Sequence, residues 1–151
     1  MNLLKDSADQ TGLEQLRGWI ESGQQPAIGE TLQFSLVEVS EGRAVFAGTP
    51  GPHAYNPIGS VHGGYAATLL DSACGCAVHA ALGAHQGYTT LELKVAYHRG
   101  LSASTGPVRA EGKVVSIGKR VAFAEARITD DAGRLYASAT STLLVFEMKS
   151  S

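Results

Sequence analysis

The segment from about Gly64 to Leu82 constrains the fold of this chain more than any other stretch. At helical spacing it carries one apolar face and a second face of mostly small residues, so a helix here is apolar nearly all round. Such a helix must be buried, and Gly83 follows in a position suited to ending it. The first face comprises Ala66, Leu69, Leu70, Ala73, Ala77 and Ala80, and the second comprises Gly64, Ala67, Asp71, Cys74, Gly75 and Val78.

Alternating apolar residues predict strands on both sides of this helix. A short amphipathic helix over Thr11–Ser22 comes first, and Gly23 ends it. Because no further long helix could serve as a crossover, we expect the last four strands to form an antiparallel meander in an α+β fold. The expected strands are Leu32–Val39, Arg43–Ala47, Tyr88–His98, Val108–Ile117, Val121–Thr129 and Leu135–Phe146.

Length and charge narrow the class of protein. The 151 residues suit one domain, which needs neither disulfides nor a metal to fold. With 12 Lys+Arg against 14 Asp+Glu, the formal charge of −2 argues against binding to nucleic acid. The sequence begins without an apolar leader, and Asp71 and His79 interrupt its longest apolar stretch. We therefore expect a soluble cytoplasmic protein that does not enter membranes.

The run His62-Gly63-Gly64 stands where a polar loop meets the start of the long helix. The first amides of a helix have no acceptor within the helix and lie at the positive end of its dipole. Glycine lets a ligand approach them closely, so the arrangement suits a polarised carbonyl oxygen, as acyl transfer requires. A purely structural role for the glycines, relieving crowding at the junction, is the alternative.

Asp71 is an acid in a helix that otherwise consists largely of Ala, Leu, Cys, Val and Gly. A carboxylate there loses solvation unless it has partners or a chemical role. It is thus either a paired structural acid or a group that acts on a substrate.

The spacing of these two features predicts an assembly. Asp71 follows Gly63 by eight residues, which is about 12 Å along one helix, so a single helix cannot easily aim both groups at one carbon. Two antiparallel copies of the helix across a twofold axis would bring the amides of one copy to the Asp71 of the other. We therefore expect a dimer with shared sites.

These residues resemble the hotdog-fold acyl-CoA thioesterases, specifically the phenylacetate-pathway type within the 4-hydroxybenzoyl-CoA thioesterase superfamily. The resemblance covers about residues 30 to 146 and implies an antiparallel sheet wrapped around one long central helix. It suggests an N-terminal helical extension over residues 1–30 and one hotdog domain over residues 31–148. Its central motif is Asn56…Gly59…His62-Gly63-Gly64…Leu69-Leu70-Asp71, and the later matching segments are Val95–Tyr97, Ser116–Phe123 and Asp131–Ala137.

The resemblance also implies a mechanism. Asp71 is the catalytic carboxylate, acting on water as general base or attacking the thioester itself. The Gly63 amide of the partner subunit polarises the thioester carbonyl, and Asn56 and His62 support that side of the site. Thr90 falls where relatives place a hydroxyl that helps to hold the water.

The substrate implied is an aryl- or medium-chain acyl-CoA, cleaved to free acid and CoA without a further cofactor. Members of the family are homodimers or dimers of dimers, that is homotetramers. Relatives commonly have a proline where this chain has Gly100, which bears on the role of the arginine before it. Tyr65 and Tyr88 are candidates for the acyl pocket, and the candidates for holding the substrate and the CoA phosphates are Gly64, Arg99, Gly118, Lys119 and Arg120.

Other site classes fit the sequence less well. The positions of Cys74, Cys76, His79 and His85 lack the spacing of structural zinc sites. Ser60 lacks the glycine that a nucleophile elbow needs two residues later, and phosphate-loop and dinucleotide fingerprints are missing. The remaining alternatives are a hotdog hydratase or dehydratase, which relies on a differently placed His, and a non-catalytic module that binds acyl-CoA.

Overall fold

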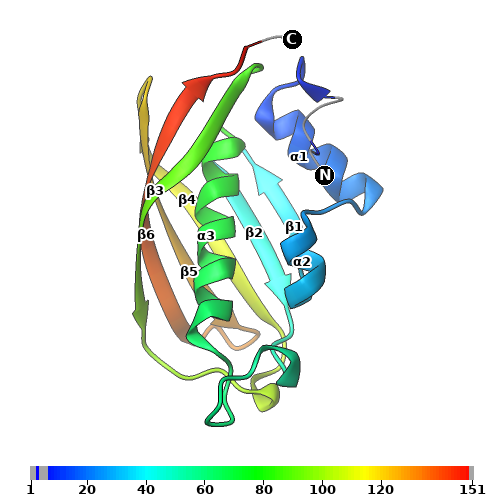
Figure 1. Ribbon diagram of the computed structural model, residues 1–151, viewed down its shortest axis with the longest axis vertical. Helices are drawn as coiled ribbons and strands as arrows, with labels where there is room; N and C mark the ends of the chain where they lie inside the picture. Colours follow the sequence, from blue (N-terminus) through cyan, green and yellow to red (C-terminus); the bar gives the residue numbers. More distant parts are fainter. Residues whose placement is uncertain (1–2, 4–6, 150–151) are drawn as a thin grey trace.

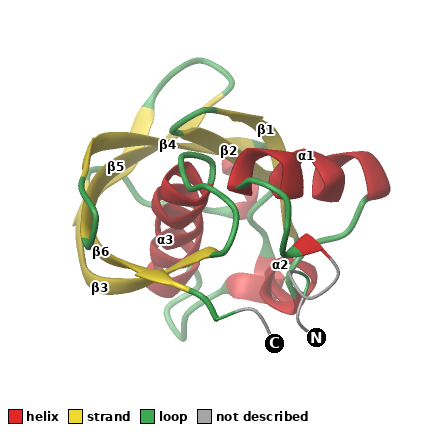
Figure 2. Cartoon of the chain, turned by 90° about the horizontal axis from the view of Figure 1, so that it is seen from above, coloured by secondary structure: helices red, strands yellow, loops and turns green. Residues whose placement is uncertain are grey.

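The long helix α3, Gly63–His79, lies against the concave face of a six-stranded antiparallel sheet in the computed structural model (Figures 1 and 2). The structure describes residue 3 and residues 7–149. The sheet curls so far that α3 contacts all six strands. The other elements are α1 Gly12–Ser22, α2 Ala27–Leu32, β1 Phe34–Ser40, β2 Arg43–Gly48, η2 Pro52–Ala54, β3 Gln86–Tyr97, η3 Ala103–Thr105, β4 Val108–Ile117, β5 Val121–Asp130 and β6 Leu135–Glu147.

The burial of α3 follows from its composition. Side chains on both of its predicted faces, Leu70 and Cys74 among them, have no exposed surface. Gly112 of β4 allows the closest approach, because a Cβ atom at this position would overlap the backbone carbonyl of Ala73. The helix therefore rests directly on the backbone of the sheet.

Two features of the core differ from the sequence prediction. The helix ends at His79 rather than at Leu82, and the residue that caps it is Ala80 in a right-handed helical conformation. Gly83 is therefore not the C-cap, and its N–H instead donates to Gln86 Oε1 at 2.8 Å. Two hydrogen-bonded turns follow the helix, in which the Ala81 N–H donates to the Val78 carbonyl and the Leu82 N–H donates to the His79 carbonyl.

The predicted meander of the last four strands is also wrong in one place. The strand order is β1-β2-β4-β5-β6-β3, so only β4, β5 and β6 form a meander. Strand β3 pairs with β6, and β4 pairs with β2. Strand β3 thus forms the edge of the sheet opposite to β1. From there it covers a side of α3 that β1 and β2 do not reach, so that the curved sheet closes around the helix.

The N-terminal helices cover the remaining side (Figures 1 and 2). Helix α1 begins as predicted, with Thr11 Oγ1 accepting from the Glu14 N–H, and ends at Gly23 in a left-handed conformation. Helix α2, a single short helix after Pro26, is not predicted by the sequence pattern, and β1 consequently begins two residues later than predicted.

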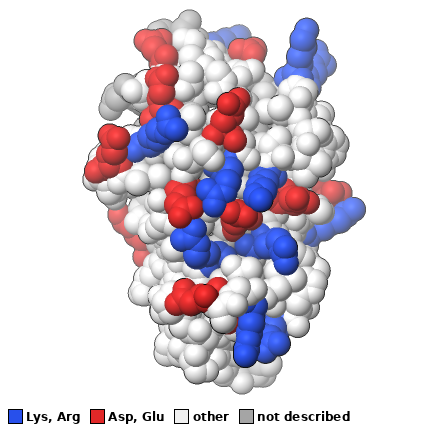
Figure 3. All heavy atoms as spheres, turned by 180° about the vertical axis from the view of Figure 1, so that it is seen from behind, with Lys and Arg blue, Asp and Glu red and all other residues white. Residues whose placement is uncertain are grey.

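The outer face of the sheet carries charges of both signs (Figure 3). Arg43 bonds Glu38 and Glu111, and Arg109 bonds Glu38 at 2.9 Å. Hydrogen bonds from these arginines lower the pKa of Glu38. No helix in the described part of the chain is long and apolar enough to cross a membrane.

Candidate active site

Asp71 and Thr90 lie side by side in the fold. Asp71 lies in the middle of α3 and Thr90 in the middle of β3, and the Thr90 hydroxyl donates to Asp71 Oδ1 at 2.9 Å. Asp71 is half-buried rather than fully enclosed. One carboxylate oxygen therefore has a fixed partner, while Oδ2 has no hydrogen bond from any residue that the structure describes.

A cavity of about 190 Å³ opens beside this pair. Its wall is mainly apolar and aromatic, and much of it comes from the N-terminal part of the chain. Such a wall suits the apolar part of a ligand, while Asp71 and Thr90 supply polar groups at its edge. The residues that line it are Trp19, Gln25, Pro26, Ile28, Gly29, Phe34, Phe46, Asp71, Ser72, Gly75, Cys76, Tyr88 and Thr90.

Cys76 is the one thiol in this wall. Burial raises the pKa of Cys76 to about 12, so the side chain stays protonated near neutral pH. Because the thiolate is the nucleophilic form, Cys76 acts as an apolar wall residue.

The start of α3 offers a backbone amide. His62 caps the helix, and its Nδ1 accepts from the Gly64 N–H at 2.8 Å. The Gly63 N–H makes no hydrogen bond within residues 7–149. The Tyr97 hydroxyl donates to the Gly63 carbonyl and fixes this turn from β3. Of the two glycine amides, that of Gly63 is thus the one available to a ligand.

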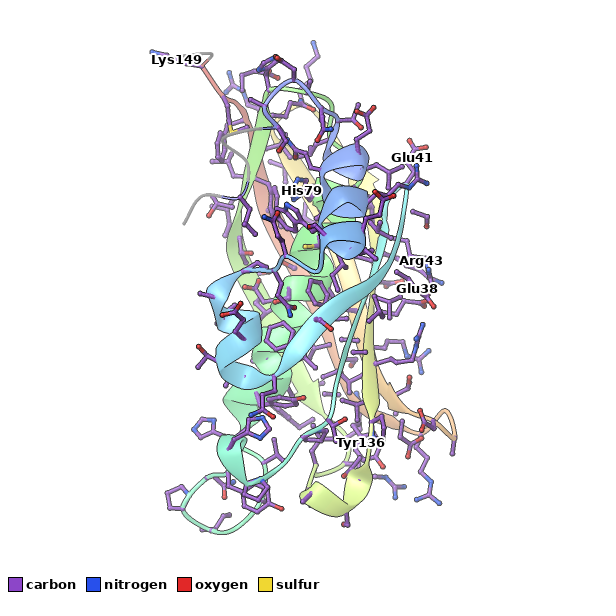
Figure 4. All side chains as sticks on the ribbon, turned by 90° about the vertical axis from the view of Figure 1, so that its right-hand side faces the viewer. Glu38, Glu41, Arg43, His79, Tyr136 and Lys149 are labelled. Carbon is purple, nitrogen blue, oxygen red and sulfur yellow. The ribbon has the colours of Figure 1, made fainter. Side chains whose placement is uncertain are left out.

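Gly63 also lines a second cavity, of about 230 Å³. His62, Gly63, Tyr97 and Arg99 contribute to its wall. The two cavities share no lining residue. Figure 4 shows Tyr136, which lines the second cavity, near the opposite end of the molecule from His79. Within one chain, Asp71 and Gly63 therefore line different cavities.

A model of the thioesterase superfamily matches residues 58–137, which is more than half of the chain. The chain belongs to the thioesterase superfamily. Its matched part contains the start of α3, Asp71 and Thr90. The membership confirms the resemblance stated above and the hotdog fold, and gives thioester hydrolysis as the class of reaction.

Individual relatives agree with this assignment. A 1,4-dihydroxy-2-naphthoyl-CoA hydrolase of Listeria monocytogenes is 27% identical over 77% of this chain and 93% of that protein. A Halobacterium salinarum protein named a candidate esterase is 40% identical over 76 residues, which are 49% of this chain and 48% of that protein. The solved structure of a phenylacetic acid degradation-related protein from Ralstonia eutropha aligns with a TM-score of 0.75 at 27% identity, covering 88% of this chain and 98% of that one.

Asn56 lies in the loop before the start of α3 and organises it. Its Oδ1 accepts from the N–H groups of Ile58 and Ser60, each at 3.1 Å, and its Nδ2 donates to Ser60 Oγ. All of these hydrogen bonds lie within residues 56–60, so the Asn56 side chain stabilises the loop that leads to His62.

The predicted cations lie in two places. Arg99 lines the second cavity, beside Gly63. Lys119 and Arg120, which follow Gly118 in the turn between β4 and β5, line a separate hollow of about 620 Å³ at the Gln86 end of β3. Within one chain the structure does not bring these two groups together. No cluster of three metal-ligating side chains is found in the described residues of this thioesterase.

The two tyrosines proposed for the acyl pocket have different positions. Tyr88 lines the first cavity, whereas Tyr65 is 2% exposed and packs against Gly48. Sequence reasoning missed Trp19, Gln25 and Ile28, because only the docking of α1 and α2 brings them to the cavity.

Proposed function

We propose that this protein hydrolyses an aryl- or medium-chain acyl-CoA to the free carboxylic acid and CoA. The observation that carries the proposal is the Asp71–Thr90 pair at the edge of a cavity with a largely apolar wall. The apolar wall accommodates an acyl group, and the carboxylate stands where a water molecule can be activated next to the thioester carbon.

The contacts of Asp71 define its part in the reaction. The hydrogen bond from Thr90 orients the carboxylate and leaves Oδ2 to take a proton from water or to attack the thioester carbon directly. The Thr90 oxygen keeps lone pairs that accept a hydrogen bond from the same water. As the carbon becomes tetrahedral, negative charge develops on the thioester oxygen, where a backbone amide at a helix N-terminus stabilises it.

The amide that does this comes from a second copy of the chain. Strand β3 is an edge of the sheet, and an edge strand with unpaired backbone groups readily pairs with another chain. Its residues Leu91 and Tyr97 are more than half exposed. Antiparallel pairing of two β3 strands across a twofold axis sets the two α3 helices antiparallel, so that Gly63 of one copy approaches Asp71 of the other.

The same pairing gathers the predicted CoA-binding residues. It places the Gln86 end of β3 in one copy beside the Tyr97 end in the other, because the strands run in opposite directions. Lys119 and Arg120 of one copy then lie near Arg99 and Gly63 of its partner. Three cations around one channel suit the phosphates of CoA without a basic surface.

The test of the reaction is thiol release from a panel of aryl- and medium-chain acyl-CoAs. We expect Asp71→Asn, which keeps the shape of the side chain but removes its charge, to lower kcat by at least about a hundredfold. Asp131→Asn, in the exposed turn between β5 and β6, is the matched control and should retain full activity. Wild-type-like turnover by Asp71→Asn would contradict the mechanism, and tight binding without turnover by the wild type would favour a non-catalytic module.

Shared sites have a separate test. Subunits carrying Asp71→Ala and subunits carrying Asn56→Ala are each expected to be inactive, the latter because the loop before Gly63 loses its internal hydrogen bonds. After mixing and refolding in equal amounts, about a quarter of wild-type activity should return, since half of the dimers each contain one intact site. Verified heterodimers that stay inactive would refute the shared site.

A further inference from the structure

The cavity beside Asp71 contains a tyrosine whose hydrogen bonding is controlled from outside the cavity. The Tyr88 hydroxyl lies 3.2 Å from His79 Nδ1, and His79 Nε2 lies 2.7 Å from Gln15 Oε1. Gln15 Nε2 in turn donates to the Ser7 carbonyl at 2.8 Å. This chain of contacts runs from the N-terminal region through α1 and α3 to β3, with His79 beside α1 in Figure 4.

The donor and the acceptor of each hydrogen bond in this series can be assigned. A carbonyl can only accept, so the amide nitrogen of Gln15 faces Ser7 and its oxygen must accept from His79. His79 is 3% exposed, and burial lowers its pKa to about 4, so its ring is neutral and carries one N–H. That N–H is on Nε2, which leaves Nδ1 as an acceptor, and the Tyr88 hydroxyl donates to it.

The packing holds these groups in place. Trp19 contacts the His79 ring edge-on, with the ring centroids 5.7 Å apart. Gln15 is 6% exposed. Burial also raises the pKa of Tyr88 well above its ordinary value, so its hydroxyl keeps the proton that it donates. The hydroxyl proton of Tyr88 is therefore engaged by His79, and the oxygen can serve a ligand only as an acceptor. The thiol of Cys76, which also lies beside this hydroxyl, is a weak donor with which the hydroxyl of a ligand competes.

The phenol end of Tyr88 lies at the cavity wall. A Cβ atom added at Gly75, which also lines the cavity, would be 3.2 Å from Tyr88 Cε2 and 4.0 Å from its hydroxyl oxygen. We propose that Gln15 and His79 fix the direction of the Tyr88 hydrogen bond, and that Tyr88 is thereby the specificity-determining residue that accepts a hydrogen bond from a hydroxyl on the acyl group. This inference rests on the proposed function.

A second polar side chain in the same cavity wall is further evidence that the acyl group carries a polar substituent. Gln25 lines the cavity, and its Oε1 is shielded from solvent without a hydrogen-bond partner in the described part of the chain. A buried polar atom without a partner is costly and rare. A hydroxyl can both donate and accept, so it matches the Gln25 amide in either orientation.

The experiment compares two matched pairs of CoA thioesters, hexanoyl with ω-hydroxyhexanoyl and phenylpropanoyl with para-hydroxyphenylpropanoyl. The readout is the ratio of kcat/KM within each pair, which is independent of how much of a variant is correctly folded. We expect the wild type to prefer the hydroxylated member of at least one pair by about tenfold, and Tyr88→Phe to bring that ratio to about one.

Variants of His79 separate positioning from simple packing. His79→Gln keeps a donor towards Gln15 and an acceptor towards Tyr88, so it should retain most of the preference. His79→Leu frees the Tyr88 proton, so Tyr88 can then donate as well as accept. We therefore expect His79→Leu, unlike the wild type, to favour para-methoxyphenylpropanoyl-CoA, whose ether oxygen can only accept, over phenylpropanoyl-CoA. Hydrolysis of both members of each pair with equal efficiency by the wild type, an unchanged ratio in Tyr88→Phe, or the same discrimination against the methoxy compound by the wild type and His79→Leu would overturn this inference. A wild type that hydrolyses none of the four thioesters would instead overturn the proposed function.

Discussion

Acidification should weaken the folded state through one buried side chain, His79. Burial lowers its pKa from 6.5 to about 4, so the folded protein keeps it neutral while the unfolded chain takes up a proton below pH 6.5. The stability that the neutral ring contributes is complete above pH 6.5 and is lost progressively as the pH falls towards 4. Between pH 7.5 and pH 5 the loss is about 2 kcal/mol, since one pKa unit corresponds to about 1.4 kcal/mol.

The assay is urea unfolding at a fixed protein concentration at several pH values between 5 and 7.5, because association with a second copy would make stability concentration-dependent. His79→Gln is the control, since it removes the titrating group and retains every other one. Subtracting its free energy of unfolding from that of the wild type at each pH isolates His79. The carboxylates Glu38 and Glu111, whose pKa values are lowered by hydrogen bonds from Arg43 and Arg109, contribute mainly below this range. Parallel curves for the two proteins would refute the assignment of a buried neutral His79.

Three further outcomes follow from the packing and the site. Gly112→Ala should destabilise the protein by about 3 kcal/mol in urea unfolding, because its Cβ meets the Ala73 carbonyl, while Gly100→Ala, in open space, should change stability by less than about 0.5 kcal/mol. Gly75→Ala should raise KM more for bulky than for small acyl groups, since it narrows the cavity beside Tyr88; equal effects would contradict that wall. In a single turnover in oxygen-labelled water, label found on Asp71 indicates a nucleophile, because it requires an anhydride that water opens at the Asp71 carbon; label in the released acid alone contradicts that route and is the result expected of a general base.

The elements of the fold were predictable because their signals are local. The apolar periodicity of α3 and the alternation in β4, β5 and β6 indicate which side of each element is buried. They therefore locate the helices and strands, but they do not indicate which other element covers the buried side. The pairing of β3 with β6 is a contact between distant segments, so the alternation within β3 does not indicate which strand lies beside it. The end of α3 was misplaced for a related reason: the apolar residues continue past His79 because the following turns are buried too.

The candidate site, like the fold, was predictable only where the signal is local. Asp71 and the His62-Gly63 helix start were visible because each breaks a local pattern, an acid in an apolar helix and paired glycines at a helix start. The contact between Thr90 and Asp71 was accessible only through resemblance, since they lie on different elements. The cavity wall was out of reach, because Trp19 and Ile28 look like ordinary apolar residues of short helices.

Different parts of the chain supply the groups proposed to act on the thioester and the wall that contacts the acyl group. The groups proposed to act on the thioester lie within residues 58–137, which match the thioesterase superfamily, whereas much of the acyl cavity comes from residues 19–34 outside that range. Gln15 connects the two parts, because from α1 it fixes the ring of His79 at the end of α3. A change in the N-terminal helices can thus alter which acyl group is accepted while Asp71 and Thr90 keep their geometry. Exchanging the N-terminal helices with those of a relative should therefore alter the preferred acyl group, and chimaeras whose preference always follows residues 58–137 would contradict this division.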